Sequence, residues 1–392
     1  MAGDDIAALT NDAEGLSAKG LRVIAVAKGG GTDGPRLVGL AGVADKIRED
    51  SRETVDQIRG LGVSVKMLTG DSLPIAVSIA RQIGLGDKVG TMHDGKNAED
   101  RMKSLDSTIE DSGGIAEIYP EDKYAIVKAL QGRGHIVGMT GDGINDAPAL
   151  QQAEVGVAVR DATDIAKDSA SAVLTTEGLG GIVAMIKTGR TIYQRIFSWM
   201  LNMITKKTHL VGYIVAVLFL THYFIISILS MVLLVFLTDF ATMSISTDNV
   251  RYSLKPDSLN VSQLFKIGAS LGILSTVEGV ALTMAGLSYF GLNGGTSRLY
   301  TFGFTYLVLA GLFNLLVVRE RGHFWKSRPS NVLIITTVAE ILVVSGIALS
   351  GFLELAPLGY PTLLGILGYV SIVSFLVNDP VKVYLVSNST PA

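Results

Sequence analysis

The hydrophobic positions along the chain follow two patterns, which divide it near its middle. Up to residue 189, short β-rich runs alternate with segments of helical period at 51–61, 74–83 and 121–131. The β-rich runs read LRVIAVA, RLVGLAGV, VSVKML, IAEIY, HIVGMT, VGVAV and SAVLT. This alternation of strand and helix predicts an α/β domain with a doubly wound parallel sheet.

In the second half, the apolar residues form long uninterrupted runs instead. Six runs are long enough to cross ~30 Å of hydrocarbon as helices. They cover residues 200–220, 224–244, 267–290, 299–318, 332–353 and 358–377. Buried helices of a large soluble core are the other interpretation, and six such runs in one half of a chain argue against it. The sequence therefore predicts an all-α membrane region, a six-helix transmembrane bundle that follows the α/β domain.

The charges support this division. Residues 1–189 hold 20 Lys/Arg and 28 Asp/Glu, whereas residues 190–392 hold 13 and 8. The loops on one side of the predicted bundle are basic, whereas those on the other side contain Arg298 as their only Lys or Arg. The basic set is Arg251, Lys255, Lys266, Arg319, Arg321, Lys326, Arg328 and Lys382. Because cytoplasmic loops carry an excess of Lys and Arg, we expect an integral protein of the cell membrane with its soluble half and both termini in the cytoplasm.

Composition excludes several classes of site and partner. The chain has 392 residues and no cysteine, which excludes disulfides and thiolate metal sites. Its first ten residues lack the basic and apolar regions of a signal peptide. No basic stripe with interleaved aromatic residues is present, so we expect no nucleic-acid partner.

Polar residues gather where three of the predicted strands end, in MLTGDS at 67–72, YPEDKY at 119–124 and MTGDGIND at 139–146. In open parallel sheets, ligands bind beyond the carboxyl ends of the strands. The Thr69 hydroxyl and the Gly70 amide can approach phosphate oxygens, and the Lys123 ammonium can neutralise a phosphoryl group. The simpler interpretations are a helix N-cap at Asp71 or Ser72 and a solvated surface lysine.

The third stretch carries two carboxylates close together. Glycines allow the backbone to turn sharply after the strand. Asp142 and Asp146 can then face a hard cation such as Mg²⁺, which takes oxygen ligands and keeps several waters. Asn145 can bond a loop that carries a phosphate. An ordinary Gly/Asp/Asn turn is the simpler interpretation of this stretch alone.

Taken together, MLTGDS, YPEDKYAIVKAL and GMTGDGINDAPAL resemble the phosphorylation domain of P-type ATPases, which has the haloacid dehalogenase fold. DKIREDS at 45–51 is similar to the hinge segment of that family near bound ATP, with Lys46 where the family has proline. The resemblance implies that Asp45 and Arg48 bind the nucleotide.

The resemblance also implies a reaction. In the family, an aspartate attacks the γ-phosphate of ATP and becomes an aspartyl phosphate, while Mg²⁺ neutralises the developing charge. ATP and Mg²⁺ are the implied cofactors, and Asp142 and Asp146 are the implied Mg²⁺ ligands. The residues implied around the transferred phosphoryl group are Thr69, Gly70, Asp71, Lys123 and Asn145.

The family carries its nucleophile in a D-K-T-G-T motif. The 392 residues of this sequence contain neither that motif nor the family's T-G-E-S loop. We therefore expect the C-terminal half of a P-type ATPase, inactive alone and completed by a separately encoded N-terminal half. The expected domains are a remnant of the nucleotide-binding domain at 1–30, an incomplete phosphorylation domain at 31–188 and a transmembrane domain at 189–392. A non-catalytic truncated membrane protein and a membrane-tethered phosphatase with a substitute nucleophile are the alternatives.

Asp239 is the main candidate for ion transport, because charged residues at membrane depth are functional candidates by default. Its apolar surroundings suit a carboxyl that picks up and releases a proton. VFLTDFATMSIS around it resembles the sixth helix of the plasma-membrane proton-pump subfamily, with Thr238 and Phe240 replacing an asparagine and a glycine. The basic loop RERGHFWKSRPS at 319–330 also resembles that subfamily.

Asn202, Lys206 and His209 share one helix face in the first span. These residues predict a positively charged side chain opposite Asp239, with His209 at the position where the resembled proton pumps hold a basic residue. Snorkelling of the lysines to the headgroups is the simpler interpretation. Glu278 and Glu340 could be ion ligands or interhelical hydrogen-bond partners. Few oxygens cluster on the first two spans, which favours proton export over Ca²⁺, Mg²⁺, K⁺ or Na⁺ as the transported ion.

Overall fold

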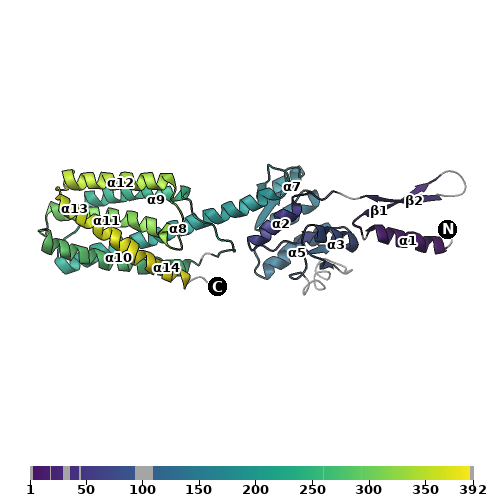
Figure 1. Ribbon diagram of the computed structural model, residues 1–392, viewed down its shortest axis with the longest axis horizontal. Coiled ribbons are helices and arrows are strands. Elements are labelled where there is room, and N and C mark those ends of the chain that lie inside the picture. The colour runs from purple at the N-terminus through teal and green to yellow at the C-terminus, as the bar shows by residue number, and fades with distance from the viewer. Residues whose placement is uncertain are drawn as a thin grey trace. The chain divides into compact units, whose positions relative to one another are not determined.

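The computed structural model describes residues 3–17, 19–29, 36–43, 46–92, 109–258, 260–292 and 294–388. The chain divides into two compact units, each described here by itself. The first unit comprises 1–186 with 254–256, and the second comprises 187–253 with 257–392. Figure 1 labels the elements of both units.

The first unit contains parallel sheets, as predicted, in two three-stranded parts. One part has the strand order β3-β5-β4 and the other has the order β6-β7-β8. The strands are β3 (Met67–Leu68), β4 (Val89–Thr91), β5 (Gly114–Ala116), β6 (Gly138–Gly141), β7 (Val155–Ala158) and β8 (Ala172–Val173).

Helices flank these strands. α2 (Ser51–Gly60) precedes β3, α3 (Leu73–Gln82) connects β3 to β4, and α5 (Pro120–Gly132) connects β5 to β6, as crossovers between parallel strands require. In the second part, the short turn η1 (Ile144–Asp146) leads into α6 (Ala147–Gln152), and α7 (Asp164–Ser169) precedes β8.

The first two predicted strands do not join the parallel sheets, which corrects the expectation for them. β1 (Arg22–Lys28) and β2 (Arg36–Val43) form an antiparallel two-stranded sheet of their own, which α1 (Gly3–Ser17) precedes. The physical reason is the short connection between them. Parallel neighbours need a crossover of a dozen or more residues, whereas antiparallel strands can be joined by a short turn.

The two parallel parts share a hydrophobic core. Leu68 of β3 packs against the cluster that contains Met139 of β6, and also against the cluster that contains Ile115 of β5. Position 156 of β7 needs a glycine, because a Cβ there would lie only 2.2 Å from the Leu150 carbonyl oxygen. These contacts bring the ends of β3 and β6 into one region.

The second unit is helical. Six helices among the described residues are long and apolar enough to cross a membrane, as the sequence predicts. Each of α9, α10 and α12 begins at a polar N-cap, where the Ser227, Asn260 and Ser330 side chains accept hydrogen bonds from the third residue beyond each cap. The helices are α8 (Gly180–Thr221), α9 (Ile228–Ser244), α10 (Val261–Tyr289), α11 (Ser297–Val318), α12 (Asn331–Ser350) and α13 (Tyr360–Val373), which continues through the π-helix η4 (Ser374–Asn378) into α14 (Asp379–Ser387).

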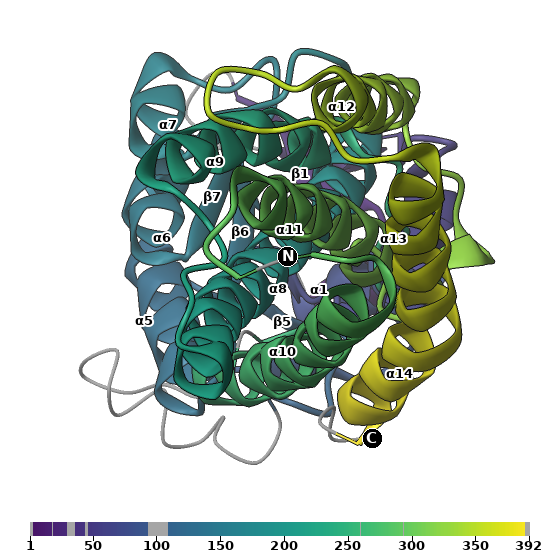
Figure 2. The same cartoon turned by 90° about the vertical axis from the view of Figure 1, so that its left-hand side faces the viewer.

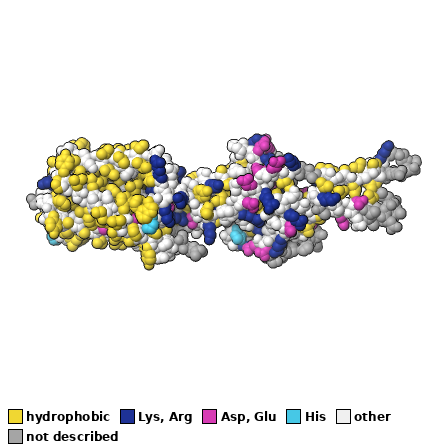
Figure 3. Space-filling model, viewed as in Figure 1, with side chains coloured by type: hydrophobic (Ala, Val, Ile, Leu, Met, Phe, Trp, Pro, Cys, Tyr) yellow, Lys and Arg dark blue, Asp and Glu magenta, His cyan; other side chains and the backbone are white. Residues whose placement is uncertain are grey.

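Helix α11 lies in the middle of this bundle, as Figure 2 shows from the end of the helices. Its central 18-residue window is 72% buried, against 28–44% for the other candidate spans. Phe302, Phe304 and Tyr306 on α11 are almost fully buried. The outer surface of the bundle in Figure 3 is covered by apolar side chains, which is the pattern expected of a bundle whose outside meets lipid.

A buried ion pair stabilises the end of the bundle where the chain beyond α9 meets the α11–α12 loop. The Arg319 guanidinium donates to both carboxylate oxygens of Asp248, at 2.7 and 3.2 Å, and both side chains are 1% exposed. Asp248 also accepts from the backbone amide of Ser330 at 2.9 Å. The short turn η2 (Ile245–Thr247) after α9 is thereby tied to the start of α12.

We expect Gly156→Ala to lower the free energy of unfolding of the first unit by ~1–3 kcal/mol, because the added methyl group overlaps the Leu150 carbonyl oxygen. Gly132→Ala, at a helical position with open space around it, should leave stability unchanged or raise it by up to ~1 kcal/mol. Urea unfolding monitored by pulse proteolysis of the full chain measures both. Equal stability of the two variants would contradict the close approach.

Arg319→Ala should lower the stability of the second unit by ~3–5 kcal/mol, because it leaves the buried Asp248 carboxylate without its cation. The matched control is Arg328→Ala, which removes an exposed arginine from the same loop. Thermal unfolding of both variants in detergent measures the difference. Similar midpoints for the two variants would show that the buried pair contributes little.

Candidate functional site

The three strand-end stretches meet in the first unit. Thr69 follows β3 and donates its amide to the Ile115 carbonyl of β5 at 3.0 Å. The chain beyond β5 returns to this loop, where the Ile118 amide donates to the Thr69 carbonyl at 3.3 Å and the Glu117 amide donates to the Asp71 carbonyl at 3.1 Å. The stretch with Thr69 and the stretch that leads to Lys123 are therefore joined by backbone hydrogen bonds.

Asp71 organises its own loop. The Thr69 hydroxyl donates to the Asp71 carboxylate at 2.9 Å, and the Asp71 amide donates back to the Thr69 hydroxyl at 3.1 Å. Ser72 occupies the N-cap position of α3, but its side chain makes no capping bond. The Glu117 carboxylate instead accepts from the Leu73 amide at 3.0 Å. Ser72 is thus the N-cap residue by position, as one of the simpler interpretations has it, but a carboxylate from another loop satisfies this donor.

Lys123 joins the second and third stretches. It lies in the first turn of α5, and its Nζ is 2.6 Å from Asp146 Oδ1. The two side chains are 20% and 7% exposed. The pair is therefore largely removed from water, where an ion pair has more effect than at the surface.

Asp146 is occupied on both of its oxygens. Its other oxygen, Oδ2, accepts from the amides of Asp142 and Gly143, each at 3.2 Å. A Cβ at Gly141 would lie 2.5 Å from the Asp146 side chain, so glycine is needed there. Asp146 thus shapes the loop, whereas Asp142 and Asn145 are exposed at its tip.

The donor set suits a magnesium ion that keeps most of its waters. The described residues contain no cluster of three or more His, Cys, Asp or Glu side chains that could hold a metal ion. Mg²⁺ is commonly held by one or two carboxylates together with waters and substrate phosphates. The exposed carboxylate of Asp142 fits that role, whereas Asp146 already bonds Lys123 and two amides. The metal pair Asp142 and Asp146 stays a prediction.

The predicted nucleotide residues divide into one that is described and one that is not. Asp45 lies outside the described residues. Arg48 lies beside Asp50 and Gly178 and interacts electrostatically with Asp161, whose pKa is lowered mainly by hydrogen bonds from Arg160. Arg48 is therefore part of a mixed-charge surface, and its role toward ATP stays a prediction.

In the second unit, Lys206 is the cation beside Asp239. Its Nζ donates to Thr238 Oγ1 at 3.2 Å and to Asp239 Oδ1 at 3.3 Å. The Lys206 side chain is 13% exposed and that of Asp239 is 53% exposed. The lysine therefore reaches across to α9, and the simpler interpretation of snorkelling to the headgroups does not describe it.

His209 and Asn202 are held by other partners, so the four predicted transport residues do not form one cluster. His209 is buried and its Nε2 lies 3.1 Å from the Tyr306 hydroxyl of α11. The Asn202 carbonyl accepts from Asn314 Nδ2, also on α11, at 3.0 Å. The expectation that His209 is the cation opposite Asp239 differs from the arrangement found, in which Lys206, one turn earlier, makes that contact.

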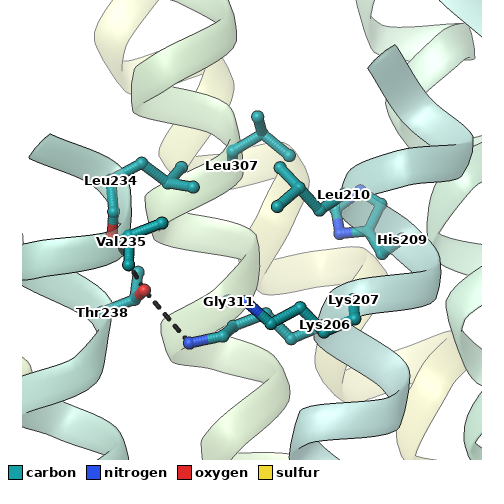
Figure 4. A pocket seen from close by; sticks show the side chains of 9 residues that line it. All are labelled: Lys206, Lys207, His209, Leu210, Leu234, Val235, Thr238, Leu307 and Gly311. Carbon is teal, nitrogen blue, oxygen red and sulfur yellow. Dashed lines mark hydrogen bonds between the residues drawn. The ribbon is translucent and has the colours of Figure 1, made fainter. Parts of the chain in front are cut away.

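A small cavity lies between α8, α9 and α11, and Figure 4 shows the residues that line it. Its polar lining residues are Lys206, Lys207, His209 and Thr238, and apolar residues such as Leu210 and Leu234 complete the lining. Its volume is about 20 Å³, which is enough for one water molecule. A water in this cavity would lie beside the Lys206–Thr238 hydrogen bond.

Glu340 of α12 contacts the same region of α9. Its Oε1 accepts from the Ala241 amide at 2.9 Å, and Oε2 is buried without a hydrogen-bond partner among the described residues. The sequence pattern had marked Glu340 as polar at membrane depth. The pattern gave no signal for Tyr306 or Asn314, because a tyrosine or an asparagine in an apolar span has no distinctive spacing.

Comparisons with known proteins show which families the chain resembles. Residues 4–154 match the family model described as haloacid dehalogenase-like hydrolase. A protein of Methanocaldococcus jannaschii assigned as a cation-transporting ATPase is 34% identical over 353 residues, which is 89% of this chain and 44% of that protein. Plasma membrane ATPase 1 of Saccharomyces cerevisiae is 34% identical over 322 residues, which is 80% of this chain and 35% of the relative.

Plasma membrane ATPase of Kluyveromyces lactis is likewise 34% identical, over 84% of this chain and 38% of its own length. The chain thus spans less than half the length of the curated relatives that it matches. Together with the six apolar helices, these matches indicate an integral membrane protein and confirm the resemblance drawn from the motifs. The chain is related over most of its length to the P-type cation-transporting ATPases, and it carries a haloacid dehalogenase-like domain followed by membrane helices.

Proposed function

We propose that the chain is part of an ATP-driven cation pump whose first unit handles an aspartyl phosphate and whose second unit carries a proton across the membrane. The observation that carries the proposal is the Lys123–Asp146 ion pair of 2.6 Å. It joins two strand-end loops, and backbone hydrogen bonds join the third to them. The names of the relatives, cation-transporting ATPase and plasma membrane ATPase, support the same reaction class.

In this proposal, each loop supplies one kind of group to the phosphoryl that is transferred. The Thr69 hydroxyl, oriented by Asp71, and the Lys123 ammonium bind its oxygens. Asp142 holds the Mg²⁺ ion, which neutralises charge on the phosphoryl group when bound. Asn145, exposed beside Asp142, positions the neighbouring loop. Such preorganised charges act on the transition state without further rearrangement.

The nucleophile must come from a segment that carries the missing motif, and the sheets offer a place for it. Among the described strands, β3 pairs only with β5, and β6 pairs only with β7, so each of these two strands has one unpaired edge. An exposed edge can accept an added strand through main-chain hydrogen bonds. A strand parallel to β3 and β6 would end between Thr69 and Asp142 and would place an aspartate there. A separately encoded N-terminal half is the proposed source.

For the transported ion, the charges around Asp239 favour a proton. The Lys206 ammonium lies 3.3 Å from the Asp239 carboxylate, and a fixed positive charge at that distance opposes a second cation. Beside the Lys206–Asp239 pair, the structure describes the Thr238 hydroxyl as a further oxygen that contacts the lysine, whereas Ca²⁺ takes six to eight oxygen ligands. By the charge rule, the basic loops favour a cytoplasmic position for the soluble unit and both termini, which supports export as the direction of transport.

Co-expression with a D-K-T-G-T-bearing N-terminal half should give vanadate-sensitive, ATP-driven proton transport in vesicles. Asp239→Asn should abolish it, because the amide cannot release a proton. Glu354→Gln, outside the candidate spans, is the matched control and should transport normally. Transport by Asp239→Asn at the control rate would disprove the role of Asp239, and transport of a metal ion with no proton movement would replace the proton by that ion.

Two substitutions separate phosphoryl handling from stability. Lys123→Met should lower the stability of the first unit by ~1–3 kcal/mol, since it leaves the Asp146 carboxylate without its charged donor. Asp142→Asn should change stability by less than ~0.5 kcal/mol, because this side chain is exposed. Both should lose Mg²⁺-dependent phosphoenzyme when paired with the N-terminal half.

Urea unfolding and acid-stable incorporation of labelled phosphate from ATP measure these effects. Lys128→Met, on the exposed side of the same helix α5, is the control for both readouts. Normal phosphoenzyme in Asp142→Asn would contradict the metal role of Asp142. Complete absence of phosphoenzyme with every pairing would favour a non-catalytic membrane protein.

A further inference from the structure

A second polar pair lies inside the bundle, between α10 and the π-helix η4. Asn378 Nδ2 donates to Glu278 Oε2 at 3.1 Å. The Tyr369 hydroxyl of α13 donates to the backbone carbonyl of Glu278 at 2.9 Å and fixes the same turn of α10. None of these residues contacts Asp239 or Lys206 through the hydrogen bonds described above.

One polar atom of each partner is left over. Glu278 Oε1 and Asn378 Oδ1 are both buried and both lack a hydrogen-bond partner among the described residues. Asn378 is only 7% exposed. A buried acceptor without a donor is unfavourable, and two of them on side chains that are already bonded to each other require one explanation.

No cation neutralises Glu278 among the described residues. The titratable groups that face it are Tyr306 on α11 and Tyr369 on α13, together with the buried imidazole of His209 behind Tyr306. Lys382 on α14 is fully buried, and its ammonium is taken up by three backbone carbonyls and by Asp379. An ionised Glu278 would therefore be an unpaired negative charge at membrane depth, which is costly.

We propose that Glu278 is a proton-binding site, in which Oε1 carries the proton and donates it to Asn378 Oδ1. A carboxylic acid and a carboxamide then form a closed pair with two hydrogen bonds, from Nδ2 to Oε2 and from Oε1 to Oδ1. One proton satisfies both unpartnered atoms and removes the buried charge. Deprotonation leaves the Nδ2–Oε2 bond and sets two acceptor oxygens against each other.

The π-helix supplies the geometry that this pair needs. Residues 374–378 form a π-helix between α13 and α14, and such segments occur frequently at functional sites. One extra residue in a turn rotates all later side chains by about 100°, since an α-helix has 3.6 residues per turn. Asn378, the last residue of the π-helix, donates to Glu278 of α10, and Asp379, the next residue, contacts Lys382 and His323.

The site is separate from the Asp239–Lys206 pair in position and chemistry. The Asp239 side chain is 53% exposed and faces a cation, whereas Glu278 accepts from an amide through Oε2 and keeps Oε1 buried. The bundle thus holds two carboxyl groups with opposite environments. The inference concerns the chain's own protonation state and holds whether or not the chain acts in a pump.

Infrared spectroscopy of the full chain in lipid nanodiscs, with the glutamate carboxyl carbons isotopically labelled, tests the proposal at neutral pH. A protonated carboxyl group has a carbonyl band distinct from that of a carboxylate. We expect such a band in the unmodified chain and its loss in Glu278→Gln. Glutamine keeps the size of the side chain and can form the same two hydrogen bonds with Asn378, so this variant should fold.

Asn378→Leu removes the acceptor and should shift the remaining Glu278 band to higher frequency, because the acid loses its hydrogen bond. This shift is a readout that a purely structural role would not produce. Glu340→Gln, on α12, is the matched control and should leave the Glu278 band in place. An unchanged band in Glu278→Gln would show that Glu278 is ionised, and an unshifted band in Asn378→Leu would show that no proton is shared; either result overturns the proposal.

Discussion

The ion pair between Lys123 and Asp146 is the contact on which the soluble unit's site depends. Asp146 ends a glycine-rich turn, and its two oxygens are shared between the lysine of α5 and the amides of its own loop. One carboxylate therefore fixes the backbone of the third loop and the position of the second. Because the pair is mostly shielded from water, its geometry is held more firmly than a surface contact would hold it.

The same requirement, that a charge in an apolar setting must find a partner, organises the membrane unit. Asp248 is matched by Arg319, Asp379 by Lys382, and Asp239 by Lys206. Each pair links segments that are apart along the bundle or along one helix. Two carboxyl groups follow the requirement differently: Glu340 accepts from the Ala241 amide, and Glu278, in our proposal, binds a proton instead of a cation.

The unpaired edges of β3 and β6 connect the fold to the proposed reaction. Both belong to one compact unit, and Leu68 of β3 packs against the core cluster of β6. A sheet edge that is buried on one side and unpaired on the other is a place where a further strand gains hydrogen bonds. The loops with Thr69 and Asp142 lie at the ends of these same strands, so a strand added there would complete both the sheet and the proposed site.

The sequence alone determined the elements and the class of chemistry. Runs of about 20 apolar residues report a membrane span directly, and glycines and acidic residues after short strands report a phosphate loop. The helices and the three loops follow from such local periodicity, whereas the relation to P-type ATPases comes from the resemblance of the three loop motifs to that family. The antiparallel pairing of β1 and β2 agrees with the seven residues that connect them, which are too few for a crossover between parallel strands.

Only the tertiary structure decided which side chains meet. Lys206 and His209 are three residues apart on α8 and look equivalent in sequence, yet only Lys206 reaches Asp239, whereas His209 turns to Tyr306. Asp142 and Asp146 look like twin ligands, yet Asp146 is already bonded. Asn378 donates to Glu278 from a π-helical turn, which the spacing of residues in the sequence does not predict. The physical reason is that periodicity assigns a residue to a face of its own helix or loop, whereas a hydrogen-bond partner is set by how separate elements pack.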